Sequence, residues 1–161
     1  MREAAMTPAL RLEEFFAGRT RCWGLFEDRF GTLRRQFVID LDGRWDGRVL
    51  SLAESFRYDD GETGRRDWTI LPLADGVYEG RATDVVGVAR GRVMGNHFRW
   101  RYAMDLKVRS SVWRVRFDDH LILLPDGVLL NRAHMSRWGV TLGSVSAAFR
   151  RVEGETQAIA A

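Results

Sequence analysis

The most regular pattern in the chain spans residues 98–108 and reads FRWRYAMDLKV. Apolar and charged side chains alternate along it. The apolar set comprises Phe98, Trp100, Tyr102, Met104 and Leu106, and the charged set comprises Arg99, Arg101, Asp105 and Lys107. Because successive side chains of a β-strand point to opposite faces, this stretch predicts a strand with its apolar face in a core and its charged face in water.

The same period of two recurs along most of the chain after Arg21. Further inward-facing sets are predicted at Leu33, Phe37, Ile39 and Leu41, at Leu50, Leu52, Phe56 and Tyr58, and at Trp113, Val115 and Phe117. Turn signals recur about every ten residues, at 29–31, 42–47, 59–61, 74–76, 95–96, 125–127 and 138–139. Helices are too few to cover a parallel sheet. The pattern therefore predicts an all-β fold, an antiparallel up-and-down barrel of about eight to ten strands.

One N-terminal helix is predicted ahead of the strands. Thr7 suits the cap, Pro8 suits the first helical position, and Gly18 suits the stop. Its apolar stripe consists of Leu12, Phe15 and Phe16. This stripe would lie over the sheet or plug a mouth of the barrel. We expect residues 1–152 to form a single β-barrel domain and residues 153–161 to form a flexible C-terminal tail.

Composition narrows the class of protein. The chain has 161 residues, 45% of them hydrophobic, which is enough to bury a core. Its 25 basic and 22 acidic residues are interspersed, which favours solvated strand faces over a nucleic-acid surface. No apolar run approaches the ~20 residues of a membrane helix, and Arg2, Glu3 and Arg11 interrupt the place of a signal peptide. With Cys22 as the single cysteine, we expect a cytoplasmic protein that binds no nucleic acid and has no transmembrane segment.

Three carboxylates share their alternation phase with apolar neighbours: Glu54, Asp84 and Asp119. A lone buried carboxylate is costly, so each should meet a cation, a hydroxyl or a ligand. The candidate cations on comparable phases are Arg35, Arg66 and Arg132. Three interpretations remain open at this point: a structural ion-pair network, a site for the polar end of a ligand, and an acid/base pair for catalysis.

Other motifs favour structural roles. Gly87, Gly91 and Gly95 recur at four-residue intervals, which would place them on one face of a strand where bending or close approach is needed. No GxGxxG motif supports a phosphate-binding loop. The three histidines His97, His120 and His134 are far apart in sequence and lack HExxH spacing, so no metal site and no cofactor are predicted.

The chain contains six tryptophans. Trp68, Trp100 and Trp113 fall on predicted interior faces. There they either fill the core or line an apolar cavity.

A series of short motifs carries a resemblance to a known family. They are FFAG at 15–18, WG at 23–24, DRFG at 28–31, FRYDDGE at 56–62, RRDW at 65–68, YEG at 78–80, DVVG at 84–87, GN at 95–96, WRY at 100–102 and FDD at 117–119. Their order and number resemble the bacterial family called domain of unknown function 3833, over residues 12–151. The resemblance implies no established activity. Many members look like lipoproteins anchored by an N-terminal cysteine, whereas Cys22 follows no apolar signal. The family's β pattern is similar to lipocalin-like (calycin) barrels.

The leading functional hypothesis is a lipocalin-like protein that binds a small hydrophobic or lipid-like ligand inside the barrel. The residues expected to bind it are Glu54, Arg66, Trp68, Asp84, Trp100, Tyr102, Trp113, Asp119 and Arg132. One alternative is an enzyme or accessory factor in lipid modification, with Asp119 or Glu54 as the acid or base. The other is a structural or interaction protein whose barrel is filled by side chains. Interior volume distinguishes the third hypothesis from the first two.

Overall fold

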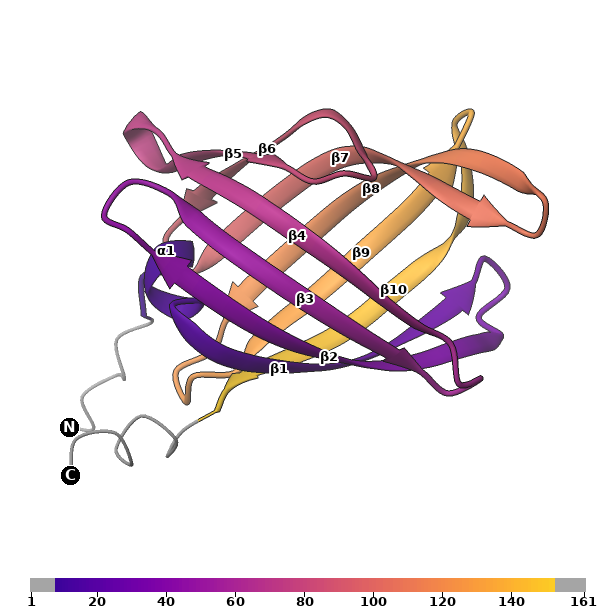
Figure 1. Cartoon of the computed structure of the whole chain (residues 1–161), viewed down its shortest axis with the longest axis horizontal. Coiled ribbons are helices and arrows are strands. Elements are labelled where there is room, and N and C mark those ends of the chain that lie inside the picture. The colour runs from indigo at the N-terminus through magenta and orange to yellow at the C-terminus, as the bar shows by residue number, and fades with distance from the viewer. Residues whose placement is uncertain (1–7, 153–161) are drawn as a thin grey trace, which may run out of the picture.

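A computed structural model describes residues 8–152, which form a closed antiparallel barrel of ten strands (Figure 1). The strands are β1 (Gly18–Asp28), β2 (Leu33–Trp45), β3 (Leu50–Tyr58), β4 (Thr63–Pro72), β5 (Val77–Arg81), β6 (Val85–Met94), β7 (His97–Val108), β8 (Ser111–Leu123), β9 (Leu129–Arg137) and β10 (Val140–Arg151). Each strand pairs with its neighbour in the chain, and β1 pairs with β10 to close the barrel. The predicted all-β, up-and-down barrel is therefore confirmed. Thr7 and the predicted tail at 153–161 lie outside the described residues.

The helix is shorter than the sequence predicted. It is the single turn α1 (Leu12–Phe15), and Arg11 rather than Thr7 occupies the N-cap position, without a side-chain cap. Arg11 has an extended backbone, and before it Leu10 is buried and donates its amide to the carbonyl of Gly95 at 2.9 Å instead of continuing the helix. The expectation that Pro8 begins the helix is therefore wrong. No helix within residues 8–152 has the length and apolar character needed to cross a membrane.

The helix closes one end of the barrel (Figure 1). Leu12, Phe15 and Phe16 are buried there, as an apolar plug requires. The hydroxyl of Tyr78 on β5 donates to Oε2 of Glu13 at 2.6 Å and ties the helix to the wall. Gly43 on β2 has no side chain where the carbonyl oxygen of Phe16 passes, and a Cβ atom at this position would collide with that oxygen.

Irregularities in the strands correct several details of the predicted pattern. A register shift between β1 and β2 lies next to Leu33, which is half-exposed rather than interior. The predicted turn at 42–43 lies inside β2. Gly87 (φ +69°) sits at a bulge of β6 and Gly95 (φ +62°) in the following turn, while Gly91 packs against Phe98. The three glycines therefore do not line one face of a single regular strand.

Candidate ligand-binding cavity

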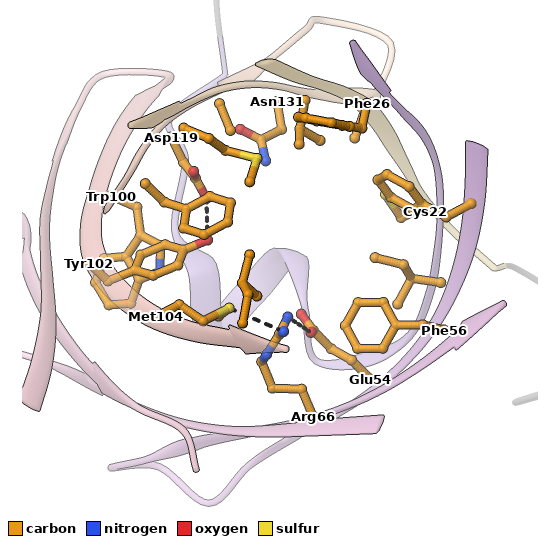
Figure 2. A pocket seen from close by; sticks show the side chains of 18 of the residues that line it. Cys22, Phe26, Glu54, Phe56, Arg66, Trp100, Tyr102, Met104, Asp119 and Asn131 are labelled. Atoms are coloured by element: carbon orange, nitrogen blue, oxygen red, sulfur yellow. Dashed lines mark hydrogen bonds and ion pairs between the residues drawn. The ribbon is translucent and has the colours of Figure 1, made fainter. Parts of the chain in front are cut away.

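The barrel encloses a cavity of about 800 Å³. It extends from Leu12 and Phe16 at the helix to Lys107 and Trp113 near the opposite end. Figure 2 shows side chains from around the wall pointing into this space with its centre left open. The lining is mainly apolar. The lumen of residues 8–152 is therefore not filled by its own side chains, unlike the filled barrel of the third hypothesis.

Aromatic rings pack along one wall. Trp68 on β4 and Trp100 on β7 are both buried, with ring centroids 5.8 Å apart, and Tyr102 lies 5.5 Å from Trp68 in an edge-to-face arrangement. Gly80 on β5 leaves room for these rings, because a Cβ atom there would lie 2.6 Å from Trp100. The two indoles thus pack against the wall at Gly80, and both line the cavity.

A charged cluster interrupts this apolar lining. Arg66 on β4 stands opposite Glu54 on β3, and its Nη1 lies 3.6 Å from Oε2 of Glu54. On its other side, Nη2 of Arg66 donates to Oδ2 of Asp84 at 2.8 Å. Asp84 precedes β6, remains partly exposed and does not line the cavity. It holds the guanidinium from behind, while Glu54 shares the lumen with Arg66 (Figure 2).

Burial changes the proton affinity of Glu54. Its side chain is only 13% exposed, and burial raises its pKa to about 7 despite the opposing charge of Arg66. The like charge of Asp84 raises the pKa further. Near neutral pH, Glu54 therefore exists in both protonation states.

A second carboxyl faces the lumen from β8. Asp119 is 6% exposed, and Tyr102 donates to its Oδ2 at 3.0 Å (Figure 2). Burial raises the pKa of Asp119 to about 7, although the hydrogen bond from Tyr102 acts in the opposite direction. Among the described residues, neither Oδ1 of Asp119 nor Oδ1 of Asn131 on β9 has a hydrogen-bond partner. Such unsatisfied buried acceptors are uncommon and costly.

Most of the residues predicted from the sequence meet in this cavity. Those that line it are Glu54, Arg66, Trp68, Trp100, Tyr102, Trp113 and Asp119. Their part in binding a ligand stays a prediction. The prediction that Arg132 faces the cavity is wrong. Its side chain is exposed on the outer face of β9, between the inward residues Asn131 and Ala133.

Several lining residues were missed, among them Asn131 and Cys22. Asn131 could have been found from its alternation with Leu129 and Ala133, which face inward. Cys22 on β1 is fully buried against the lumen, and burial raises the pKa of its thiol far above the usual range. A lone cysteine gives no signal of such a place in sequence.

The histidines lie outside this site. His97 and His120, distant in sequence, meet across β7 and β8 with Nε2 and Nδ1 3.0 Å apart. That contact was not foreseen from their spacing. Within residues 8–152, no group of three histidine, cysteine or carboxylate side chains is arranged to hold a metal ion.

The fold and the cavity together define a lipocalin-like β-barrel with an internal, mainly apolar chamber. The profile of the family described as "Protein of unknown function (DUF3833)" matches residues 2–151, so the chain belongs to this family. A search of curated proteins found no match.

Solved structures share the fold. The S-type phycobiliprotein lyase CPES from Guillardia theta superposes with a TM-score of 0.64 at 10% identity, over 89% of this chain and 92% of that one. Rv2717c from M. tuberculosis gives a TM-score of 0.63 at 15% identity, over 92% and 99% of the two chains. At these identities the likeness establishes the barrel fold alone.

Proposed function

We propose that the barrel binds one small, lipid-like molecule in its cavity. The observation that carries this proposal is an open space of about 800 Å³ whose mainly apolar wall contains a few polar groups. Cavities of roughly 300–1,000 Å³ with this composition are typical of small-molecule sites. Apolar surface that such a molecule buries against the wall contributes about 25 cal/mol per Å².

The polar groups suggest how the molecule lies. Its apolar part would pack along the aliphatic and aromatic wall of β2 and β3, where Ile39 and Phe56 line the cavity. Its polar end would lie beside Arg66 and Tyr102, because the guanidinium of Arg66 supplies donors in the lumen and the hydroxyl oxygen of Tyr102, whose proton is given to Asp119, can still accept. Glu54, opposite Arg66 on the neighbouring strand, and Asp119, bonded to Tyr102, supply acceptors beside these groups. A polar end that both donates and accepts hydrogen bonds fits this set best.

A second candidate function is catalysis on such a molecule. The observation that favours it is the pair of carboxyls whose pKa values are raised to about 7, where one group can accept and return a proton near neutral pH. The structurally similar phycobiliprotein lyase indicates that a barrel of this kind can serve a lyase. Turnover of a bound molecule, and its loss in both Glu54→Gln and Asp119→Asn, would distinguish this candidate from simple binding.

The binding proposal can be tested with matched ligands. Freshly purified protein is extracted and the extract analysed by mass spectrometry, and delipidated protein is then titrated with decanol, decanoate and decylamine. Trp68 and Trp100 report binding through their fluorescence, because both rings line the cavity. We expect a saturable change that Trp100→Phe diminishes. Arg132→Ala is the control, since Arg132 is on the outer face.

Two negative results together would overturn the binding proposal. Absence of any co-purified molecule, together with no saturable response to any of the three ligands, would remove small-molecule binding as the function of the lumen.

A further inference from the structure

Three neighbouring turns surround part of the cavity opening. Residues 29–33 span the turn between β1 and β2, residues 107–112 span the turn between β7 and β8, and residues 137–140 span the turn between β9 and β10. The order of strands around the barrel makes these turns consecutive, and all lie at the end away from α1 (Figure 1). We refer to these three segments as the mouth arc.

Exposed apolar side chains concentrate on the mouth arc. Trp138 is 87% exposed and Phe30 is 78% exposed. Six large apolar residues among 8–152 are at least half exposed, namely Phe30, Leu33, Met94, Val112, Trp138 and Val140. All but Met94 belong to the mouth arc. Clustered exposure of this kind marks an interaction surface, whereas scattered apolar residues do not.

Trp138 is held outward at a backbone cost. Its φ of 51° lies in the left-handed region, which glycine and asparagine adopt readily and a tryptophan does not. The guanidinium of Arg137 lies 4.0 Å from the Trp138 ring centroid and 4.2 Å from that of Trp113. Because Trp113 lines the cavity, this stack links the exposed indole directly to the cavity rim. The requirements of the turn do not explain a tryptophan here.

The mouth arc is also basic. It carries Arg29, Lys107, Arg109 and Arg137 and contains no acidic residue. Within residues 8–152 none of these four cations makes an ion pair, whereas nearby Asp28 is paired with Arg34 at 2.7 Å. Acidic side chains at this end gather on the turn between β3 and β4, where Arg35 binds Asp60 and Glu62. Positive charge and exposed aromatic surface therefore coincide on one side of the opening.

We propose that the mouth arc docks on the surface of an anionic lipid bilayer, with Trp138 and Phe30 in the interface and the four cations among the headgroups. Tryptophan favours the membrane interface, and each basic residue near an anionic surface contributes about 1 kcal/mol. The acidic turn between β3 and β4 would face water, so the docked barrel would be tilted. A protein partner with an apolar face would not by itself require the unpaired cations.

Docking in this way would bring the cavity opening against the bilayer. A molecule leaving the membrane would then pass Trp113 and enter the lumen without crossing bulk water. This last step rests on the proposed function, whereas the docking itself does not.

The test is flotation of the full chain with vesicles of phosphatidylcholine alone or of phosphatidylcholine with phosphatidylglycerol. We expect binding to the anionic vesicles that weakens as salt is added, because salt screens exposed charges. The double variant Trp138→Asn, Phe30→Ser should partition about tenfold or more weaker. Asparagine suits the left-handed position of residue 138, so folding should be preserved. Met94→Ser is the matched control, because Met94 is an exposed apolar residue at the other end.

Two results would overturn the docking proposal. One is failure of the wild-type chain to float with anionic vesicles at low salt, which would leave a protein partner as the better occupant. The other is equal loss of binding in the double variant and in Met94→Ser. Titration of the same double variant with decanol in the absence of vesicles separates the two proposals, since ligand binding in solution should be retained whether or not docking fails.

Discussion

Tyr102 donates a 3.0 Å hydrogen bond to Oδ2 of Asp119, while Oδ1 of the same carboxyl has no partner among residues 8–152. One oxygen of this carboxyl thus accepts a hydrogen bond, and the other accepts none from these residues. Because burial raises its pKa to about 7, the group changes charge close to neutral pH inside the cavity. The stability of the fold and the choice of ligand should both respond to that change.

Stability should fall as pH rises from about 4 to about 7. The pKa of Asp119 is raised from 3.8 when unfolded to about 7 when folded, so its favourable contribution is present at low pH and lost as pH rises toward 7. Asp119→Asn removes the ionisation. At about pH 8 the variant should gain on the order of 1–3 kcal/mol in unfolding free energy, and its urea midpoint should depend less on pH.

Asp118→Asn serves as the neighbouring control. Asp118 faces outward, and the hydrogen bond from Arg99 lowers its pKa. The contribution of Asp118 is lost only as pH falls through that lowered pKa, and its charge is a lesser cause of the Asp119 shift than burial, so this variant should change the slope between about pH 5 and 7 much less than Asp119→Asn does. An unchanged slope in Asp119→Asn would contradict the assignment.

Anionic ligands should bind less tightly as pH rises. Glu54 and Asp119 both lose protons around pH 7 and then repel a carboxylate placed beside Arg66. For decanoate, which is ionised throughout this range, we expect the dissociation constant to increase about tenfold between about pH 6 and 8. Fluorescence titration measures it. Decanol carries no charge, so its dissociation constant should stay nearly constant, and a parallel change in both ligands would point to a different cause.

A side chain at residue 43 should loosen the plug. In Gly43→Ala the new methyl group would collide with the carbonyl oxygen of Phe16, a backbone atom that cannot turn aside. We expect a loss of about 1–3 kcal/mol in unfolding free energy, as for other overpacked sites. Gly64→Ala is the control, because its nearest neighbour, Cδ2 of Phe56, would lie 3.9 Å away. Equal stability of the two variants in urea would rule out the close approach.

Cys22 should react slowly with thiol reagents in the folded protein. Burial raises the pKa of its thiol, so little thiolate is present at neutral pH, and only the thiolate is nucleophilic. Labelling by iodoacetamide should be about a hundredfold slower than in urea-unfolded protein, and a ligand in the lumen should slow it further. Intact-protein mass spectrometry follows the reaction. Labelling at the same rate with and without saturating ligand would place the ligand away from β1.

Strand alternation predicted the fold and a large part of the cavity lining. It succeeded where one period runs unbroken, as from Phe98 to Leu106 on β7. It failed at Leu33, because a register shift turns the strand, and at Arg132, because the apolar Leu130 faces outward and conceals the true phase of β9. Asp84 lies just before β6, so strand alternation does not determine which way its side chain points.

Alternation also cannot measure the width of the barrel. The same inward residues could fill a narrow lumen or line a wide one. The closure of ten strands and the packing of Trp68 and Trp100 against the wall create the open space, and both are properties of the assembled fold. The exposure of Trp138 could not be predicted either, because assigning residues 138–139 to a turn does not say where the side chain of residue 138 points.

The helical plug, which Glu13 and Tyr78 hold in place, also affects how one bound ligand is exchanged for another. Because that end is blocked, an incoming ligand and a departing ligand must use the same opening. An incoming ligand therefore cannot displace the bound one from the opposite end of the cavity. Residence time is then set by the occupant alone. Raising the concentration of a competitor should leave the rate of release unchanged, and turnover of the bound pool would follow first-order kinetics.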